Sequence, residues 1–293
     1  MLNSSNIFCL AGGGRSPKYA PNKLLIWDDE STTEVKEIRM KSKIQNAKIK
    51  KKFLYVVCED EITVISTSDF STIETIHTVE NPSGICAIAH DPNTNLFAWP
   101  GLEKGQIQIK NFDMDKSSQV LKAHENFIAL IEFNFLGDLI ATASDKGTLI
   151  RIFNTKDKTL VTEVRRGSEK AEIYSISFDK ESKFIGTTSD RGTAHLFVVE
   201  RNKEKKEEVK NTKSIFGGVT KMIGLSSFFS SEWSFTHIRL TQGIKSICAV
   251  LNSSNSFIIV TYQGRYIEGK YDVHPKTNNT DCKIQKDTSL FSI

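Results

Sequence analysis

The sequence is poor in the features that mark secreted, metal-binding and membrane-spanning proteins. Its cysteines form no CxxC pair, and none stands at metal-ligand spacing from a histidine. The N-terminus has no basic start followed by an apolar run, and no apolar stretch approaches the roughly 20 residues that span a bilayer. We therefore expect a cytoplasmic protein whose membrane contact, where it exists, is peripheral. The five cysteines are expected to be buried reduced thiols: Cys9, Cys58, Cys86, Cys248 and Cys282.

Catalytic and cofactor-binding signatures are also lacking. The run Gly12–Gly14 is not followed by the Gly-Lys-Ser/Thr ending of a P-loop, so it predicts a turn. No HExxH motif and no Ser/His/Asp or Cys/His constellation stands out. We expect no enzyme activity, no cofactor and no metal. The formal charge of +4 is too small to imply a nucleic-acid partner.

Short β-prone runs recur along the whole chain. They combine β-branched and aromatic residues, and Gly, Pro, Asn or Asp separates them. No long amphipathic helix is apparent before residue 200. The clearest runs are Ile7–Ala11, Lys23–Trp27, Phe53–Val57, Glu61–Ile65, Gly84–Ala89, Leu96–Trp99 and Gln106–Ile109.

An internal repeat decides the fold class. Ser144-Asp145-x-Gly147-Thr148 recurs as Ser189-Asp190-x-Gly192-Thr193, 45 residues later, and weaker copies give about six repeats in all. A period near 40–45 residues is typical of a four-stranded propeller blade. The sequence therefore predicts an all-β, WD40-like β-propeller that forms a single domain over residues 1–293.

Residues 200–233 interrupt the repeat within the penultimate blade. A mixed-charge run is followed by a stretch too apolar for a solvated loop, and insertions of this length are usually functional or disordered. We expect insertion into a membrane; the alternatives are packing on its own blade or docking to a protein. The side chains expected to insert are Phe216, Met222, Ile223, Leu225, Phe228 and Phe229.

Arg165 and Arg166 lie between the two strongest repeats. In an extended segment, adjacent side chains point to opposite faces, so each guanidinium can serve a different pocket. Arginine forks match phosphate groups. The alternative is a surface pair that bridges to neighbours such as Glu163.

In this context the chain resembles the PROPPINs, WD40-like seven-bladed propellers that include the WIPI proteins and bind phosphoinositides in autophagy. The resemblance rests on Arg165–Gly167 in its flanking repeats, on Phe229–Phe235, and on Ala11–Asp29, which is most similar to the WIPI3/4-type branch. It covers nearly the whole chain. The chain starts at Met1 inside what would be the second blade. Either the first blade is missing by truncation, which we expect, or six blades close the ring.

The resemblance implies two headgroup sites for phosphatidylinositol 3-phosphate and the 3,5-bisphosphate. It also implies a monomer, peripheral on autophagosome-precursor and endosomal or vacuolar membranes, that recruits an autophagy lipid-transfer protein. The first site would comprise Thr142, Ser144, Thr148, Arg151 and Arg165. The second would comprise Arg166, Thr188, Ser189, Thr193 and His195.

Simpler roles are open for several of these residues. The Ser and Thr hydroxyls can stabilise blade turns, and His195 can be a structural histidine. A lysine cluster is expected to be a solvated face: Lys41, Lys43, Lys48, Lys50, Lys51 and Lys52. The rival functions are a scaffold that binds only proteins and, less favoured, a single-stranded RNA binder.

Overall fold

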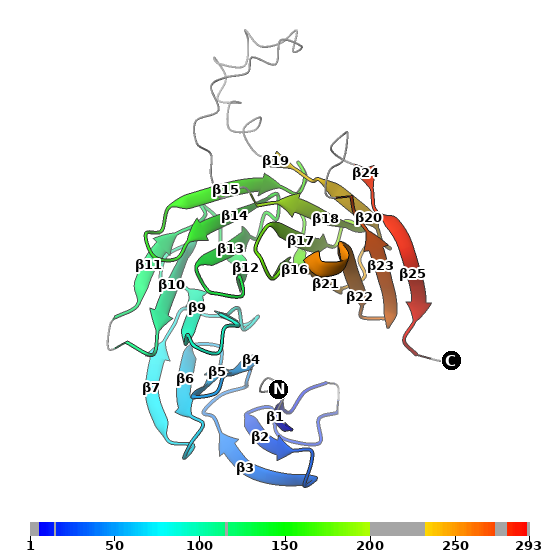
Figure 1. Ribbon diagram of the computed structural model, residues 1–293. Helices are drawn as coiled ribbons and strands as arrows, with labels where there is room; N and C mark the ends of the chain where they lie inside the picture. Colours follow the sequence, from blue (N-terminus) through cyan, green and yellow to red (C-terminus); the bar gives the residue numbers. More distant parts are fainter. Residues whose placement is uncertain (1–5, 15, 115–116, 200–231, 273–279, 292–293) are drawn as a thin grey trace. The chain divides into compact units, whose positions relative to one another are not determined.

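The computed structural model describes residues 6–14, 16–114, 117–199, 232–272 and 280–291. Its chain divides into two compact units, Met1–Ile131 and Glu132–Ile293. Six sheets make up the described residues, and each begins as an antiparallel meander of consecutive strands (Figure 1). The all-β fold class predicted from the repeat is confirmed.

The first unit holds three sheets, each formed by strands that follow one another along the chain. The first sheet comprises β1 (Ile7–Ala11), β2 (Lys23–Asp28) and β3 (Thr33–Arg39). The second comprises β4 (Asn46–Ile49), β5 (Phe53–Val57), β6 (Glu61–Ser66) and β7 (Thr72–His77). The third comprises β8 (Ala87–Ile88), β9 (Leu96–Pro100), β10 (Gln106–Asn111) and β11 (Gln119–Lys122).

The other three sheets lie mainly in the second unit, and each includes a strand that does not directly follow its neighbour along the chain. One contains β12 (Ile128–Phe133), β13 (Leu139–Ser144), β14 (Leu149–Asn154), β15 (Leu160–Arg165) and β19 (Glu232–Trp233). The next contains β16 (Ile173–Phe178), β17 (Phe184–Ser189), β18 (Thr193–Val198), β20 (Thr236–Arg239) and β24 (Thr280–Asp281). The last contains β21 (Ser246–Leu251), a 3-10 turn (Asn252–Ser254), β22 (Ser256–Thr261), β23 (Arg265–Lys270) and β25 (Lys283–Ser289).

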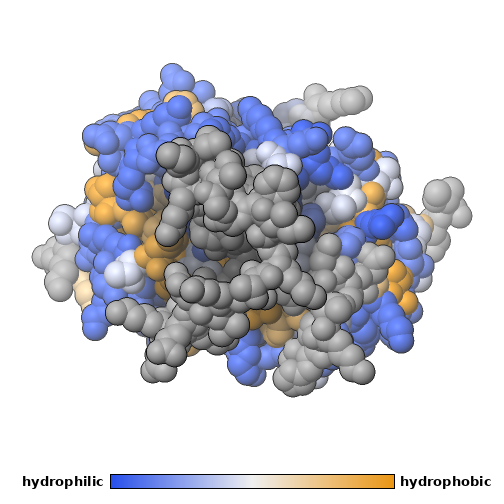
Figure 2. Space-filling view, turned by 90° about the horizontal axis from the view of Figure 1, so that it is seen from above, coloured by the Kyte–Doolittle hydropathy of each residue, from blue (hydrophilic) through white to orange (hydrophobic). Residues whose placement is uncertain are grey.

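Aromatic and branched side chains fill the space between neighbouring sheets of each unit. In the first unit, the rings of Tyr55 and Phe97 stack with centroids 4.4 Å apart, and Trp99 extends the cluster. In the second, Phe184 packs on Tyr271, and Phe257 is fully buried beside them. Offset or tilted rings at such spacings contribute beyond their buried area. Among the residues coloured in Figure 2, hydrophilic ones predominate and hydrophobic ones form scattered patches.

The 45-residue repeat is visible strand by strand. β12 and β13 recur as β16 and β17 after an offset of 45 residues, and the turn after β13 recurs after β17. Gly147 and Gly192 both have positive φ, +60° and +71°. A Cβ on Gly147 would lie 1.9 Å from the carbonyl oxygen of Ala171, so this turn requires glycine.

The strand expected over Gly84–Ala89 is shorter in the structure, where only Ala87–Ile88 forms a strand. The cause is local: Gly84 has a φ of +60°, and the Asn81 side chain bonds both the N–H and the C=O of Ile85, which makes a turn. In the described part of the chain, no helix has the length and apolarity to cross a membrane.

Candidate functional site

The two arginines lie where β15 ends, beside the turn that joins β13 to β14. Leu149 at the start of β14 is opposite Arg165 at the end of β15, and the N–H of Arg166 donates to the carbonyl of Thr148 at 3.0 Å. Both arginine side chains are 7% exposed. They are therefore not the solvent-facing surface pair of the simpler interpretation.

Most of the first predicted site shares one face of this sheet. The pairing register places Thr142 opposite Arg151 and Arg151 opposite Glu163. Alternation along the strands puts Ser144 and Arg165 on that same face, one step further along. Arg151 donates through Nε to Glu163 at 2.8 Å, so a carboxylate already neutralises part of its charge. Thr148 lies in the turn and contributes its carbonyl to Arg166.

Arg166 is held by backbone carbonyls. Its Nε donates to Gly147 at 2.9 Å, and an Nη donates to Glu169 in the linker that leads to β16. Arg191, from the turn after β17, also donates to this linker, through Nε to Lys170 at 2.9 Å. Burial lowers the pKa of Arg166, and the charge of Arg191 lowers it further. Two guanidiniums thus donate hydrogen bonds to carbonyls of this linker. Arg166 forms no ion pair with a carboxylate among the described residues.

A row of polar side chains crosses the next sheet, and His195 in this row lies close to Arg166. Thr187 on β17, His195 on β18 and His237 on β20 lie opposite one another in register. The His195 and His237 rings are 6.2 Å apart, and His195 Nε2 is 2.8 Å from the Thr193 hydroxyl. Burial lowers the pKa of His195 to about 4, with further lowering by Arg166 and His237. Arg166 and His195 are therefore close enough to sense each other's charge.

The structure separates Thr188 from the rest of the second predicted site. Thr188 lies opposite Ala194, so it points to the other face from Thr193 and His195. Its hydroxyl donates to the carbonyl of Ser246 at 2.8 Å and contacts the Ser175 hydroxyl at 2.9 Å. Ser189 falls on the His195 face by alternation and is 2% exposed. Its hydroxyl accepts from the Arg191 N–H at 3.4 Å.

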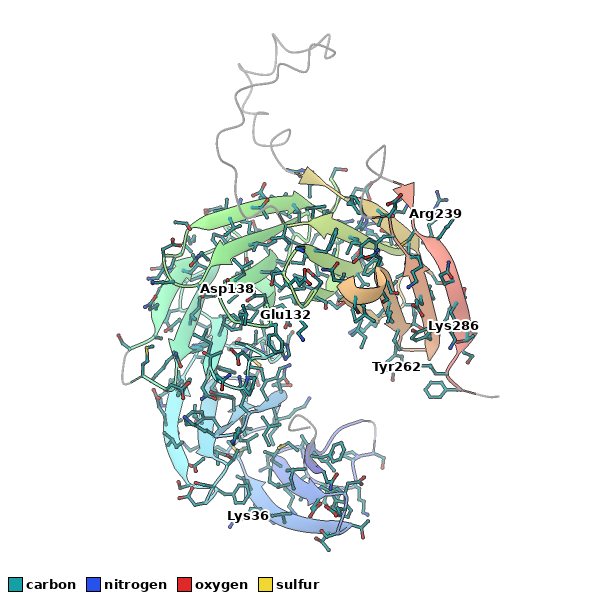
Figure 3. The ribbon with its side chains drawn as sticks, viewed as in Figure 1. Lys36, Glu132, Asp138, Arg239, Tyr262 and Lys286 are labelled. Carbon is teal, nitrogen blue, oxygen red and sulfur yellow. The ribbon has the colours of Figure 1, made fainter. Side chains whose placement is uncertain are left out.

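Sequence reasoning missed three basic residues around the second predicted site: Arg191, His237 and Arg239. Arg239 lies opposite Thr193 on β20 and projects from that strand (Figure 3). His237 and Arg239 follow the insertion, where the 45-residue period is broken, so the repeat could not assign them. The motif Ser234–Arg239, which resumes the strand pattern, was the available signal.

The insertion rejoins the fold beside Arg165. β18 and β20 pair in one sheet although residues 199–235 separate them in the chain. Within that segment, β19 pairs in parallel with β15 in the preceding sheet, with Glu232 next to Val164 and Trp233 next to Arg165. The six side chains expected to enter a membrane lie outside the described residues.

The profile of the PROPPIN family matches residues 16–284. The chain belongs to the PROPPIN family. This PROPPIN is 32% identical to autophagy-related protein 18e of Arabidopsis thaliana, over 93% of its own length and 71% of that protein. It is 36% identical to SVP1-like protein 2 of Neurospora crassa, over 69% of its own length and 46% of that protein.

Solved structures share the fold of this PROPPIN. Kluyveromyces lactis Hsv2 with complete loop 6CD superposes with a TM-score of 0.78 at 23% identity, covering 99% of this chain and 85% of that chain. A complex of KlAtg21 with the coiled coil of AgAtg16 gives a TM-score of 0.77 at 21% identity, covering 99% and 84%. The protein is an autophagy-related, WD40-like β-propeller of a non-enzymatic family.

Proposed function

We propose that this PROPPIN binds membranes through phosphatidylinositol 3-phosphate and the 3,5-bisphosphate, with one headgroup at each arginine. The observation that carries the proposal is the pair Arg165–Arg166, two buried guanidiniums at one strand end that serve opposite faces of a sheet. A buried cation that has only carbonyl partners, as Arg166 has, gains a full counter-charge when a phosphate arrives.

The two sites differ in how much of their charge is available. In the first, Thr142, Ser144, Thr148 and Arg151 accompany Arg165, and Glu163 offsets the charge of Arg151. In the second, Ser189, Thr193 and His195 accompany Arg166, with Arg239 and His237 on the next strand. Thr188 supports this site from the other face through its bond to Ser246. The second site therefore attracts an anion more strongly.

The insertion is proposed to enter the bilayer beside the headgroup sites. The chain after the insertion pairs with β15 through β19, with Trp233 next to Arg165, so the C-terminal end of the insertion lies close to the arginine pair in the fold. Weak contacts that engage the same membrane together gain affinity through effective concentration. Two headgroups and an apolar segment would hold the propeller firmly where each alone would not.

Further proposals follow from the family. We place the chain in the WIPI3/4-type branch on the sequence Ala11–Asp29, and expect a monomer on autophagosome-precursor and endosomal or vacuolar membranes. Once docked, it would recruit autophagy machinery, with a lipid-transfer protein as the expected partner. A coiled-coil partner is the other possibility, by analogy with the KlAtg21 complex.

Co-sedimentation with liposomes tests the lipid proposal. Wild type is expected to pellet with vesicles that contain phosphatidylinositol 3-phosphate and to stay in solution with vesicles that lack it. The Arg165→Thr/Arg166→Thr variant should lose this binding. Arg39→Thr/Arg265→Thr is the matched control, because it removes the same charge from two exposed arginines that are already paired with Glu37 and Asp287. Thermal melts establish that each variant is folded.

A protein-binding scaffold is the second candidate function, and one observation favours it. The Arg166 guanidinium already donates to the carbonyls of Gly147 and Glu169, which is how a purely structural arginine behaves. On this alternative, folded wild type ignores the lipid, and the arginine variant melts at a lower temperature with no change in localisation.

A further inference from the structure

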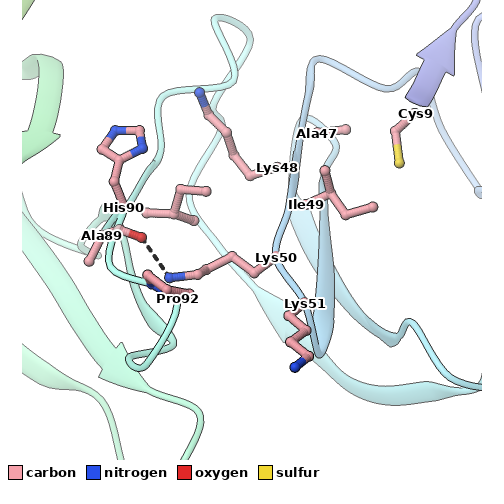
Figure 4. Close-up of a pocket in the computed structure, with 10 residues that line it drawn as sticks. Cys9, Ala47, Lys48, Ile49, Lys50, Lys51, Ala89, His90 and Pro92 are labelled. Atoms are coloured by element: carbon pink, nitrogen blue, oxygen red, sulfur yellow. Dashed lines mark hydrogen bonds between the residues drawn. The ribbon is translucent and has the colours of Figure 1, made fainter. Parts of the chain in front are cut away.

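A second cationic site lies in the first unit, around strand β4. A pocket of about 300 Å3 runs between β4, the loop after β8 and the side chain of Cys9 on β1 (Figure 4). None of the described residues that line it is acidic. The lining residues that carry or can carry positive charge are Lys48, Lys50, Lys51 and His90.

Lys50 builds the pocket and does not serve as a free cation in it. Its side chain is 5% exposed, and its ammonium donates to the carbonyls of Ala89, Asp91 and Thr94 at 2.7, 2.6 and 2.5 Å. The expectation of a solvated lysine face is wrong at this position. Lys50 fixes the loop that carries His90 and Pro92 against β4, so the pocket is held in shape before any ligand arrives.

The remaining lysines of the cluster divide into paired and unpaired groups. Lys41 bridges to Glu61 at 3.7 Å and Lys52 to Asp113 at 3.0 Å. Lys48 and Lys51 form no ion pair or side-chain hydrogen bond with any residue that the structure describes. Lys48 and His90 lie toward one end of the pocket and Lys51 lies toward the other (Figure 4).

We propose that this pocket binds a small molecule that carries two phosphate groups, one near Lys48 and His90 and the other near Lys51. Three features support this class of ligand. The volume is at the lower end of the range for small-molecule pockets, the shape is concave, and Lys48 and Lys51 lie toward separate ends of the pocket. Lysine binds phosphate as a compact point charge, and two separated lysines favour a ligand with two separated charges.

The test uses fructose 1,6-bisphosphate as a probe and titration calorimetry as the readout. Titrations are made in the Arg165→Thr/Arg166→Thr background, so that phosphate binding at the proposed lipid sites does not contribute. We expect saturable binding with one ligand per chain, and inorganic phosphate should bind at least about tenfold more weakly. Lys48→Gln/Lys51→Gln should weaken bisphosphate binding about tenfold or more.

The control removes the same charge from the same unit. Lys36→Gln/Lys43→Gln replaces two exposed lysines that do not line the pocket. Equal losses from both pairs of substitutions would mean diffuse attraction and would overturn the proposal. Absence of saturable binding, or binding of an acidic peptide such as oligoglutamate without binding of the bisphosphate, would also overturn it.

Two further measurements keep the proposal testable. In protein without substitutions, the bisphosphate should protect Lys48 and Lys51 from amine acylation, followed by mass spectrometry, and should leave Lys43 reactive. Vesicles carrying the 3,5-bisphosphate lipid identify the source of the ligand. In the arginine-substituted background, vesicle binding that depends on Lys48 and Lys51 assigns the pocket to a lipid headgroup, whereas binding of the soluble probe alone assigns it to a free metabolite.

Discussion

His195 should make lipid binding at the second site stronger as the pH falls. Its imidazole is half-buried, and desolvation, followed by the charges of Arg166 and His237, lowers its pKa to about 4, so at neutral pH the ring is uncharged. A phosphate bound between Arg166 and His195 would offset both the desolvation penalty and the positive charges that now oppose protonation. The pKa of His195 should therefore rise on binding, and complex formation should take up a proton.

The size of the effect follows from linkage. We take the compensation to return the pKa of His195 from about 4 to its ordinary value of 6.5. Affinity then increases wherever the complex binds more protons than the free protein, which is the range between those two values and just above it. Between pH 7.5 and 5.5 the gain is about tenfold, or about 1.4 kcal/mol.

The assay is vesicle binding measured at both pH values, with lipid mixtures that contain phosphatidylinositol 3-phosphate. The phosphate itself gains a proton near pH 6, which weakens binding, and the basic side chains of His237 and Arg239 lie on the neighbouring strand. His195→Gln isolates the contribution of the one ring, and His77→Gln, on the first unit, is the matched control. If wild type and His195→Gln show the same pH profile, the inference that His195 faces the bound phosphate is refuted.

Two predictions concern stability. Gly147→Ala should lower the free energy of unfolding by about 2–4 kcal/mol, because Gly147 has a φ of +60° and the added Cβ would meet the Ala171 carbonyl. Gly167→Ala, where no atom lies within 4 Å of the added Cβ, should change it by less than about 0.5 kcal/mol in the same urea titration. Lys50→Met should cost about 2–3 kcal/mol, because it keeps the apolar stem and leaves one buried and two part-buried carbonyls without their donor. Lys51→Met is its exposed control, and equal unfolding midpoints for these two variants would contradict the assigned role of Lys50.

The repeat made the fold predictable, because its signal is local and is repeated in register. Ser144-Asp145-x-Gly147 fixes a turn through backbone geometry, and alternation then sets which side chains share a face. That is enough to place Thr142, Ser144, Arg151 and Arg165 on one face of a sheet. In the observed register Thr188 lies opposite Ala194, so the same alternation places Thr188 on the other face from His195. The sequence-based assignment overlooked this.

Features that depend on contacts between distant segments were beyond the reach of sequence reasoning. In the sequence, Lys50 does not differ from the other members of a lysine run. Its burial comes from hydrogen bonds to carbonyls of a loop that lies 39–44 residues away in the chain. Likewise, the sequence predicted a phosphate site at Arg166 but not the hydrogen bonds of Arg166 to Gly147 and Glu169. Those bonds depend on where the turn and the linker lie in the folded chain. Such residues are exposed or buried according to tertiary packing, which a local pattern does not encode.

The topology explains why the arginine pair and the insertion belong together. Arg165 is the last residue of β15, and Arg166 begins the linker to β16 in the next sheet. The chain then completes β16, β17 and β18, and after residues 200–231 it adds β19 to the preceding sheet, beside Arg165, before β20 pairs with β18. The segment β19–β20 thus pairs with both sheets that carry the proposed phosphate ligands. Shortening residues 200–231 while keeping β19 should therefore weaken membrane binding and leave binding of a soluble headgroup at Arg166 intact, whereas removal of β19 should impair both.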